Sequence, residues 1–134
     1  MEINMQNLVE KAYTAKQYAY APYSGFHVGA ALLCGDGTIF TGCNIENAAY
    51  SPANCAERTA VFKAVSEGYR SFLAIAVAGS SGEYLAPCGV CRQVLMEFCD
   101  PDSFLVILAK NQTQYQSFRL GELFPHAFSK TDIV

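Results

Sequence analysis

The sequence predicts an α/β fold, a three-layer α/β/α sandwich with a mixed five-stranded sheet. Three long segments are predicted as helices, the first from apolar residues at helical spacing, and short apolar or alternating runs typical of strands lie between them. Strands separated by helices imply parallel crossovers, whereas the turn between the first two runs implies an antiparallel hairpin. The expected order is α-β-β-α-β-α-β-β, in a single domain spanning residues 1–134.

The first half of the chain should form one helix and one hairpin. Leu8, Ala12 and Ala15 follow helical spacing, and Pro22 and Gly25 interrupt the pattern. The letters GDG mark a turn between two strand-like runs. The expected segments are a helix at 4–20, a strand at 27–34, a turn at 35–37 and a second strand at 38–45.

The second half should alternate helices with strands. Asn54 is a suitable N-cap for a helix that Gly68 ends. The run FLAIAVAG is apolar throughout, as expected for a strand with both faces covered, whereas QYQSFRL alternates like an edge strand. The expected segments are helices at 54–68 and 88–99, strands at 72–79, 104–110 and 114–120, and a short helical turn with a tail at 120–128.

Composition excludes several classes of protein. Apolar residues make up 51% of the chain and charged residues 16%, which suits a packed core and not a disordered chain. The net charge is -3 and the nine Lys and Arg residues form no basic run, so a nucleic-acid partner is disfavoured. The apolar runs are too short to span a bilayer, and the first residues do not resemble a signal peptide. We therefore expect a cytoplasmic protein with no membrane partner, whose thiols stay reduced.

In a reduced compartment, a Cys-x-x-Cys pair with a distant cysteine indicates a metal site or redox chemistry. Cys88 and Cys91 lie three residues apart at a predicted helix start, so both sulfurs can face one point. Cys55 heads another predicted helix that also follows a loop, so the two helix N-termini could converge. The six cysteines are Cys34, Cys43, Cys55, Cys88, Cys91 and Cys99.

Three protein ligands with an open fourth position are typical of catalytic zinc, whereas structural zinc usually has four. None of the candidates for a fourth ligand has a paired spacing, so three ligands and a water are favoured. Those candidates are Cys34, Cys43, Cys99, His27 and His126. The alternatives are small buried cysteines or a thioredoxin-like redox pair, which would leave Cys55 and Glu57 unexplained.

The stretch SPANCAERTA places a carboxylate and a guanidinium beside Cys55. Zinc with three thiolates carries net charge -1, so activation of its water needs positive compensation. Helix N-termini supply some of it, and Arg58 could donate hydrogen bonds to a ligand sulfur. Glu57 could accept a proton from the bound water and pass it on. Taken alone, Glu57 would be explained as a first-turn glutamate that interacts favourably with the helix dipole, and Arg58 as a solvated charge.

Several linked motifs resemble the small homotetrameric zinc-dependent cytidine deaminases, nearly from end to end. The matching stretches are PYSGFHVGAALL at 22–33, GCNIENAAY at 42–50, CAERTA at 55–60, PCGVCRQVL at 87–95 and FPHAF at 124–128. The tail departs from the family pattern at His126 and after Phe128, which affects its expected placement more than the chemistry.

The resemblance implies roles for particular residues. Asn44 and Glu46, which alternate at a predicted strand end and so face one side, would bind the ribose hydroxyls. Gln93 and Arg58 would support the site without touching substrate, and Arg92 would be structural or intersubunit. The remaining roles are zinc ligation by Cys55, Cys88 and Cys91, proton transfer by Glu57, a base-carbonyl contact from the Ala56 N–H, stacking by Phe26, and contacts from neighbouring subunits by Ala48, Tyr50 and Phe128.

The implied activity is that of a hydrolase acting on a cyclic amidine. Cytidine and 2′-deoxycytidine would become uridine and 2′-deoxyuridine with release of ammonia, in pyrimidine salvage. Zinc-bound hydroxide would attack C4, and Glu57 would shuttle the protons. Three alternatives stay open: a deaminase of another small cytosine nucleoside, a polynucleotide editor, and a non-enzymatic module with four-ligand zinc.

Overall fold

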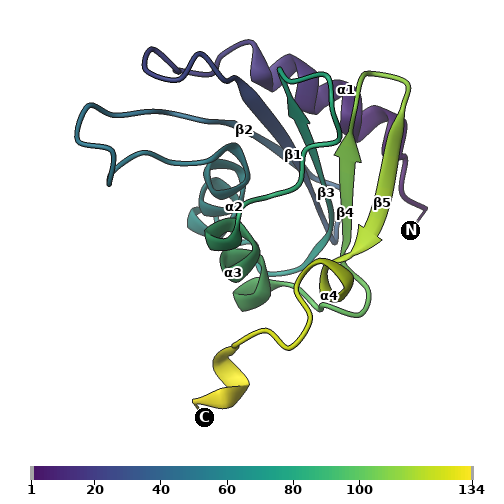
Figure 1. Ribbon diagram of the computed structural model, residues 1–134. Helices are drawn as coiled ribbons and strands as arrows, with labels where there is room; N and C mark the ends of the chain where they lie inside the picture. The colour runs from purple at the N-terminus through teal and green to yellow at the C-terminus, as the bar shows by residue number, and fades with distance from the viewer. Residues whose placement is uncertain (1, 134) are drawn as a thin grey trace.

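Helices and strands follow one another in the predicted order in the computed structural model, which describes residues 2–133 (Figure 1). A single mixed sheet of five strands lies between helices, so the predicted fold class is confirmed. Among residues 2–133, every helix is too short or too polar to cross a membrane. The elements are α1 (Met5–Lys16), β1 (Val28–Cys34), β2 (Ile39–Cys43), α2 (Ala56–Ser66), β3 (Phe72–Gly79), α3 (Gly89–Phe98), β4 (Leu105–Ala109), β5 (Tyr115–Arg119), α4 (Leu120–Leu123) and a final 3₁₀ turn, η1 (Lys130–Asp132).

The strand order across the sheet is β2-β1-β3-β4-β5. The opening hairpin pairs β1 with β2 antiparallel, and its turn places Gly37 at a φ of 93°, which suits glycine. Strand β1 also pairs antiparallel with β3, whereas β3 and β4 are parallel and are connected through α3. Strand β5 closes the sheet as an antiparallel edge. The sheet is mixed for the reason predicted, because it combines hairpins with a helical crossover.

Helix α1 covers one face of the sheet, where small side chains dominate. Alternate residues of β3, namely Ala74, Ala76 and Ala78, are buried on this face. Space is tightest at Gly29 of β1, where an added Cβ atom would lie 1.9 Å from the carbonyl oxygen of Ala12. The alanines and this glycine therefore allow the helix backbone to approach the strands closely.

Helices α2 and α3 cover the opposite face, which holds the larger apolar side chains. Ile75 and Val77 of β3 point into this layer, with Leu95 of α3 and Phe104. Helix α2 also approaches β2 closely, since an added Cβ on Gly42 would lie 2.5 Å from the carbonyl oxygen of Ala56. This contact fixes the N-terminus of α2 against the end of β2.

Three predicted boundaries differ from the structure because of long-range backbone pairing. Helix α1 ends at Lys16, since the Tyr20 backbone pairs with Asn44 and Glu46 instead of continuing the helix. Strand β2 ends at Cys43 for the same reason, because the backbone of residues 44 and 46 pairs with Tyr20. Asn54 is not the N-cap of α2, because its backbone pairs with residue 45 and its side chain donates to a threonine within the helix.

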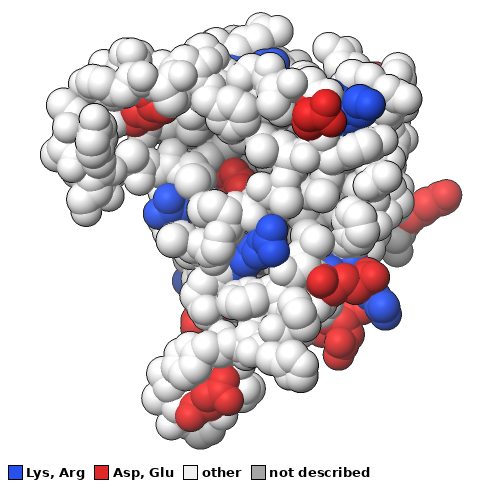
Figure 2. All heavy atoms as spheres, viewed as in Figure 1, with Lys and Arg blue, Asp and Glu red and all other residues white. Residues whose placement is uncertain are grey.

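Two segments project from the sandwich. One is the loop 44–55 between β2 and α2, and the other is the C-terminal tail beyond α4 (Figure 1). On the face drawn in Figure 2, basic and acidic side chains are scattered and form no continuous basic area.

Candidate active site

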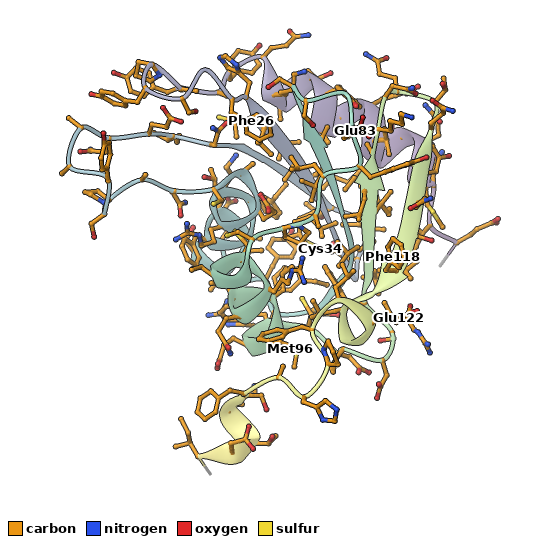
Figure 3. The ribbon with its side chains drawn as sticks, in the orientation of Figure 1. Phe26, Cys34, Glu83, Met96, Phe118 and Glu122 are labelled. Atoms are coloured by element: carbon orange, nitrogen blue, oxygen red, sulfur yellow. The ribbon has the colours of Figure 1, made fainter. Side chains whose placement is uncertain are left out.

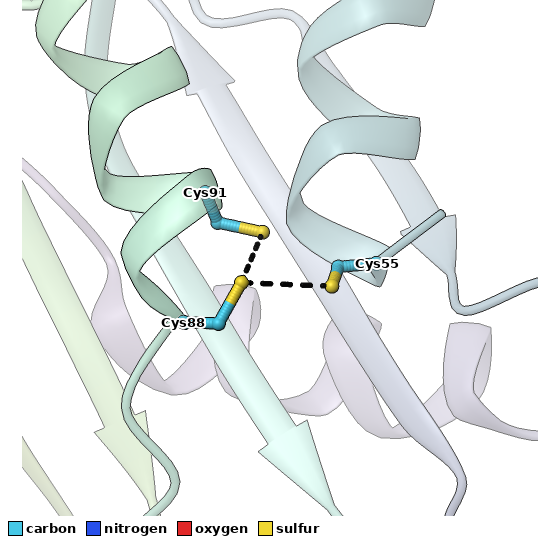
Figure 4. A group of neighbouring side chains, drawn as sticks. All are labelled: Cys55, Cys88 and Cys91. Atoms are coloured by element: carbon cyan, nitrogen blue, oxygen red, sulfur yellow. Dashed lines mark hydrogen bonds between the residues drawn. The ribbon is translucent and has the colours of Figure 1, made fainter. Parts of the chain in front are cut away.

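Three cysteine sulfurs meet where two helices begin (Figure 4). Cys55 is the N-cap of α2, Cys88 is the N-cap of α3, and Cys91 lies in the first turn of α3. The Sγ atom of Cys88 is 3.8 Å from that of Cys55 and 3.5 Å from that of Cys91, and all three atoms lie within 4.8 Å of one another. The convergence that the spacing predicts is present.

The geometry of this group fits zinc. A tetrahedral ion with Zn–S bonds of about 2.3 Å separates its sulfur ligands by about 3.8 Å. All three cysteines are free, and each thiolate lies near a helix N-terminus, which favours negative charge. Among residues 2–133, no other cysteine or histidine joins the group. The candidate Cys34, for instance, is buried among apolar side chains between the sheet and the helices (Figure 3).

The sulfurs influence one another electrostatically. Contact with the Cys91 thiol, together with hydrogen bonds from Arg58 and Cys88, lowers the pKa of Cys55 to about 5. The same contact and its own burial raise the pKa of Cys91. Thiolates this close repel one another, so a divalent cation would favour ionisation of all three sulfurs.

Arg58 makes the contact that the sequence analysis expects. Its Nη2 atom donates to the Cys55 Sγ atom at 3.3 Å. Its Nε atom is buried and has no hydrogen-bond partner within residues 2–133. A half-buried guanidinium that donates to a sulfur of the group offsets part of the negative charge of three thiolates.

Glu57 is the one buried charged side chain among the described residues, with 5% of its surface exposed. Burial, with a smaller contribution from the neighbouring Cys55, raises the pKa of its carboxyl to about 7. It lies two residues after Cys55, in the first turn of α2. A carboxyl poised near neutrality is suited to accepting and returning a proton.

The backbone and aromatic candidates lie at the ends of the elements that carry the cysteines. Ala56 is the first residue of α2, so its N–H has no partner within the helix. Phe26 precedes β1, is half-buried, and packs against the core layer that α2 and α3 cover (Figure 3). Its ring passes close to Gly79, where an added Cβ would lie 3.4 Å from the Phe26 Cζ atom.

Asn44 and Glu46 do not extend from a strand as predicted, since β2 ends at Cys43. Both instead hold the segment before β1. The Asn44 amide donates to the carbonyl oxygen of Phe26 and accepts from the N–H of Val28. The Glu46 carboxylate accepts hydrogen bonds from residues 23 and 24.

The candidates expected from neighbouring subunits are not gathered at the sulfur group within one chain. Ala48 and Tyr50 lie in the projecting loop and Phe128 in the tail. Tyr50 is 74% exposed and Phe128 is 58% exposed. The Gln93 amide donates to the Phe128 carbonyl oxygen at 2.8 Å and so ties the tail to α3.

Arg92 is structural within the chain. Its guanidinium donates to the carbonyl oxygens of Pro87 and Leu123 and so joins the start of α3 to the end of α4.

Two hydroxyl groups escaped the sequence analysis. The Ser24 hydroxyl bonds Glu46 and the Phe26 N–H, in the stretch PYSGF that otherwise signals only a turn. The Thr59 hydroxyl donates to the carbonyl oxygens of Cys55 and Cys43, and so joins the start of α2 to the end of β2. A threonine one turn after a helix start carries no signal for this contact.

Comparison with known proteins places this geometry in a family. The model of the cytidine and deoxycytidylate deaminase zinc-binding region matches residues 2–107. A cytidine deaminase of Sporosarcina psychrophila is 50% identical over 131 residues, which cover 98% of this chain and 96% of that protein. A cytidine deaminase of Halalkalibacterium halodurans is 48% identical over the same length, with 98% of each chain covered.

Solved structures agree with the sequence relatives. The crystal structure of cytidine deaminase from Burkholderia pseudomallei superposes with a TM-score of 0.89 at 48% identity, covering 94% of this chain and 100% of that one. Cytidine deaminase from Mycobacterium tuberculosis gives a TM-score of 0.82 at 40% identity, covering 95% and 98%.

Proposed function

The chain belongs to the cytidine and deoxycytidylate deaminase family with a zinc-binding region, and from this premise we propose that it deaminates free cytidine and 2′-deoxycytidine. The enzyme is a zinc-dependent hydrolytic deaminase. Water would replace the amino group at C4 of the base, giving uridine or 2′-deoxyuridine and ammonia. The observation that carries the proposal is the buried Glu57 carboxyl, which interacts with Cys55 and Cys91 of the three converging cysteines. The metabolic role would be pyrimidine salvage in the cytoplasm.

Cys55, Cys88 and Cys91 would hold the metal. When bound, Zn²⁺ supplies the Lewis acidity that makes water a nucleophile near neutral pH. Arg58 would offset the charge of the thiolates through its bond to Cys55. Three sulfur ligands would leave one coordination position for substrate chemistry, as expected of a catalytic site.

Glu57 would carry both protons. Its carboxylate would first take a proton from the attacking water and deliver it to N3 of the base. It would then take the remaining proton from the hydroxyl formed at C4 and give it to the C4 amine, which leaves as ammonia as the C4–N bond breaks. A group whose pKa lies near 7 can perform both steps at neutral pH.

The substrate would be held from two sides. The Ala56 N–H would bind the carbonyl oxygen of the base, and the Phe26 ring would stack on it. Asn44 and Glu46 would bind the ribose hydroxyls. The Asn44 amide and the Glu46 carboxylate can each make more hydrogen bonds than the ones that they make within the chain, so both keep capacity to bind hydroxyl groups.

A homotetramer would complete the site. The exposed Ala48 and Tyr50 of the projecting loop, and Phe128 of the tail, would reach the substrate bound by a neighbouring chain. Exposed aromatic side chains cluster near this loop, as expected of a surface that another chain covers. They are Tyr18, Tyr20, Tyr23 and Tyr50.

The direct test is to incubate purified protein with cytidine and follow the ultraviolet absorbance of the base, with and without a chelator. We expect turnover of cytidine and 2′-deoxycytidine that the chelator abolishes. Single-stranded DNA and free cytosine serve as comparison substrates. Preference for either would contradict the proposal, as would turnover that withstands complete removal of zinc.

The assembly is tested by mass in solution. A homotetramer predicts a species of four 14.6 kDa chains, and activity should fall when it dissociates. A fully active monomer would contradict the proposed contribution of the loop and tail to neighbouring sites.

A further inference from the structure

The segment that joins Pro22 to β1 has no regular secondary structure, yet each backbone N–H from Tyr23 to Val28 has a partner. Side chains supply most of these partners. The acceptors are Glu46 for residues 23 and 24, the Ala21 carbonyl for Gly25, the Ser24 hydroxyl for Phe26, the Ser80 hydroxyl for His27, and Asn44 for Val28. The segment that positions Phe26 is therefore held by specific polar side chains.

Ser24 occupies the centre of this network. Its hydroxyl donates to the Oε2 atom of Glu46 and accepts from the N–H of Phe26 at 3.0 Å. One hydroxyl thus connects the side chain proposed to bind the sugar with the residue proposed to stack on the base.

Phe26 is fixed on both sides of its backbone. Its N–H is bound by Ser24, and its carbonyl oxygen accepts from the Asn44 Nδ2 atom at 2.8 Å. The ring rests near Gly79, which leaves little room behind it. Loss of the Ser24 contact would free the N–H side and leave the Asn44 side in place.

The hydroxyl also determines which part of Glu46 stays available. A carboxylate offers about four lone-pair positions. The Oε1 atom accepts the two backbone N–H groups of Tyr23 and Ser24, and Oε2 accepts the Ser24 hydroxyl. The remaining position lies on Oε2, on the atom whose placement Ser24 controls.

We propose that Ser24 is a positioning residue that couples sugar recognition by Glu46 to the placement of the Phe26 ring. The inference rests on the proposed function, because it takes the roles of Glu46 and Phe26 from there. Ser24 is exposed, so its bonds add little to global stability and their loss should leave the fold intact.

The test compares two substrates in the zinc-loaded enzyme. For Ser24→Ala we expect kcat/KM for cytidine to fall about tenfold, mainly through a higher KM, as for one lost hydrogen bond to a charged group. For 2′,3′-dideoxycytidine, which lacks the hydroxyls that Glu46 would bind, the loss should be about threefold or less. Ser24→Thr, which keeps the hydroxyl, should recover most of the difference.

Ser80→Ala is the matched control. It removes the partner of the His27 N–H in the same segment, and among the described residues the Ser80 side chain makes no hydrogen bond to Glu46 or Phe26. We expect it to change the ratio of kcat/KM for the two substrates by less than about twofold, as for an ordinary surface substitution. Equal losses on both substrates in Ser24→Ala, or the same change of ratio in Ser80→Ala, would overturn the inference.

A readout independent of activity is amide hydrogen exchange in the same variants. Ser24→Ala should accelerate exchange at the Phe26 amide, and Ser80→Ala should accelerate it at His27. Unchanged exchange at Phe26 in Ser24→Ala would remove the proposed link whatever the kinetics. Absence of cytidine turnover by the unaltered, zinc-loaded protein is a different result, which would refute the proposed function and this inference with it.

Discussion

The N-cap residue of two helices in this protein is a cysteine, which seldom serves in that position. Neither Cys55 nor Cys88 makes a side-chain capping bond, because the Cys55 sulfur contacts that of Cys88, which in turn contacts that of Cys91. Each helix therefore lacks the small stabilisation that a side-chain N-cap provides. The partial positive charges of the two helix N-termini lie beside the three sulfurs and favour their ionisation to thiolates.

The role of Glu57 can be tested by a change that preserves its shape. Glu57→Gln should keep zinc and fold, because the carboxyl is not among the three sulfur ligands, but it should lower kcat at least about 10²-fold through loss of acid–base catalysis. Initial rates, zinc content and circular dichroism are the measurements. Glu67→Gln, at the exposed end of the same helix, is the control and should retain full activity. Normal turnover in Glu57→Gln would remove this residue from the mechanism.

The Glu46 carboxylate should make stability depend on pH. Hydrogen bonds from Ser24, then from the backbone of residues 23 and 24, hold its pKa below the usual value. Because the pKa is lower in the folded state, ionised Glu46 stabilises the protein at pH values above its unfolded-state pKa of about 4.3. This stabilisation is lost as the pH falls through the pKa of Glu46 in the folded state. The measurement is the urea unfolding midpoint from about pH 6 to about pH 3, a range that spans this pKa. As the pH is lowered, the midpoint should decrease less steeply in Glu46→Gln than in the unaltered protein.

Glu97→Gln provides the comparison for that series. It removes an exposed carboxylate of α3 for which the described residues provide no hydrogen bond. Its unfolding midpoints should follow those of the unaltered protein, and parallel curves for Glu46→Gln as well would contradict the prediction.

At the scale of single residues, site residues can be predicted from the sequence where they lie together in a short motif. Cys55, Glu57 and Arg58 lie within four positions, and helix geometry alone brings them to one end of α2. The Ser24–Glu46 contact was not predictable, because it joins residues 22 positions apart through two irregular segments. No periodic pattern describes the path of such segments.

Between elements, the closest approach at the glycines of residues 2–133 is that of α1 and β1. Gly29→Ala would place a Cβ atom 1.9 Å from the Ala12 carbonyl oxygen and 2.5 Å from the Lys16 nitrogen. Both are backbone atoms and cannot rotate away, so we expect the free energy of unfolding to fall by about 2 kcal/mol or more. Urea denaturation measures the change. Gly89→Ala, where no atom lies within 4 Å of the added Cβ, should stay within about 0.5 kcal/mol of the unaltered protein.

Element types were predictable from periodicity, but some element ends were not. The apolar run of β3 was expected to be covered on both faces, and the structure buries Ala76 under α1 and Ile75 under α2 and α3. The end of α1 depends instead on Tyr20, whose backbone pairs with residues 44 and 46 of the projecting loop. A partner so distant in the chain leaves no mark on local spacing.

For the molecule as a whole, the metal should act as a structural link as well as a reagent. The three sulfurs join the starts of α2 and α3, so zinc bound to the folded chain should stabilise it. A strong chelator should abolish activity and lower the melting temperature by about 5 °C or more, equivalent to roughly 1 kcal/mol. Zinc should restore both properties, whereas Mg²⁺, which prefers oxygen ligands, should restore neither. Unchanged melting after verified zinc loss would contradict a linking role.

The order of elements and the mixed sheet were predictable from the sequence, because hairpin and crossover rules constrain them strongly. The projection of loop 44–55 and of the tail was not predictable from patterning, since both consist of short turns without a periodic apolar face. Their expected role in a tetramer comes from resemblance and stays a prediction.

The alanine-rich contact beneath α1 implies an unequal tolerance of the two halves of the core to mutation. Where backbones nearly touch, every enlarged side chain meets atoms that cannot move aside, so substitutions can be accepted only when they preserve size. The layer beneath α2 and α3 contains flexible Leu, Ile and Phe side chains that can exchange volume with their neighbours. A saturation library scored for folded protein should thus be depleted of larger residues at 29, 74, 76 and 78 far more than at 75, 95 or 104.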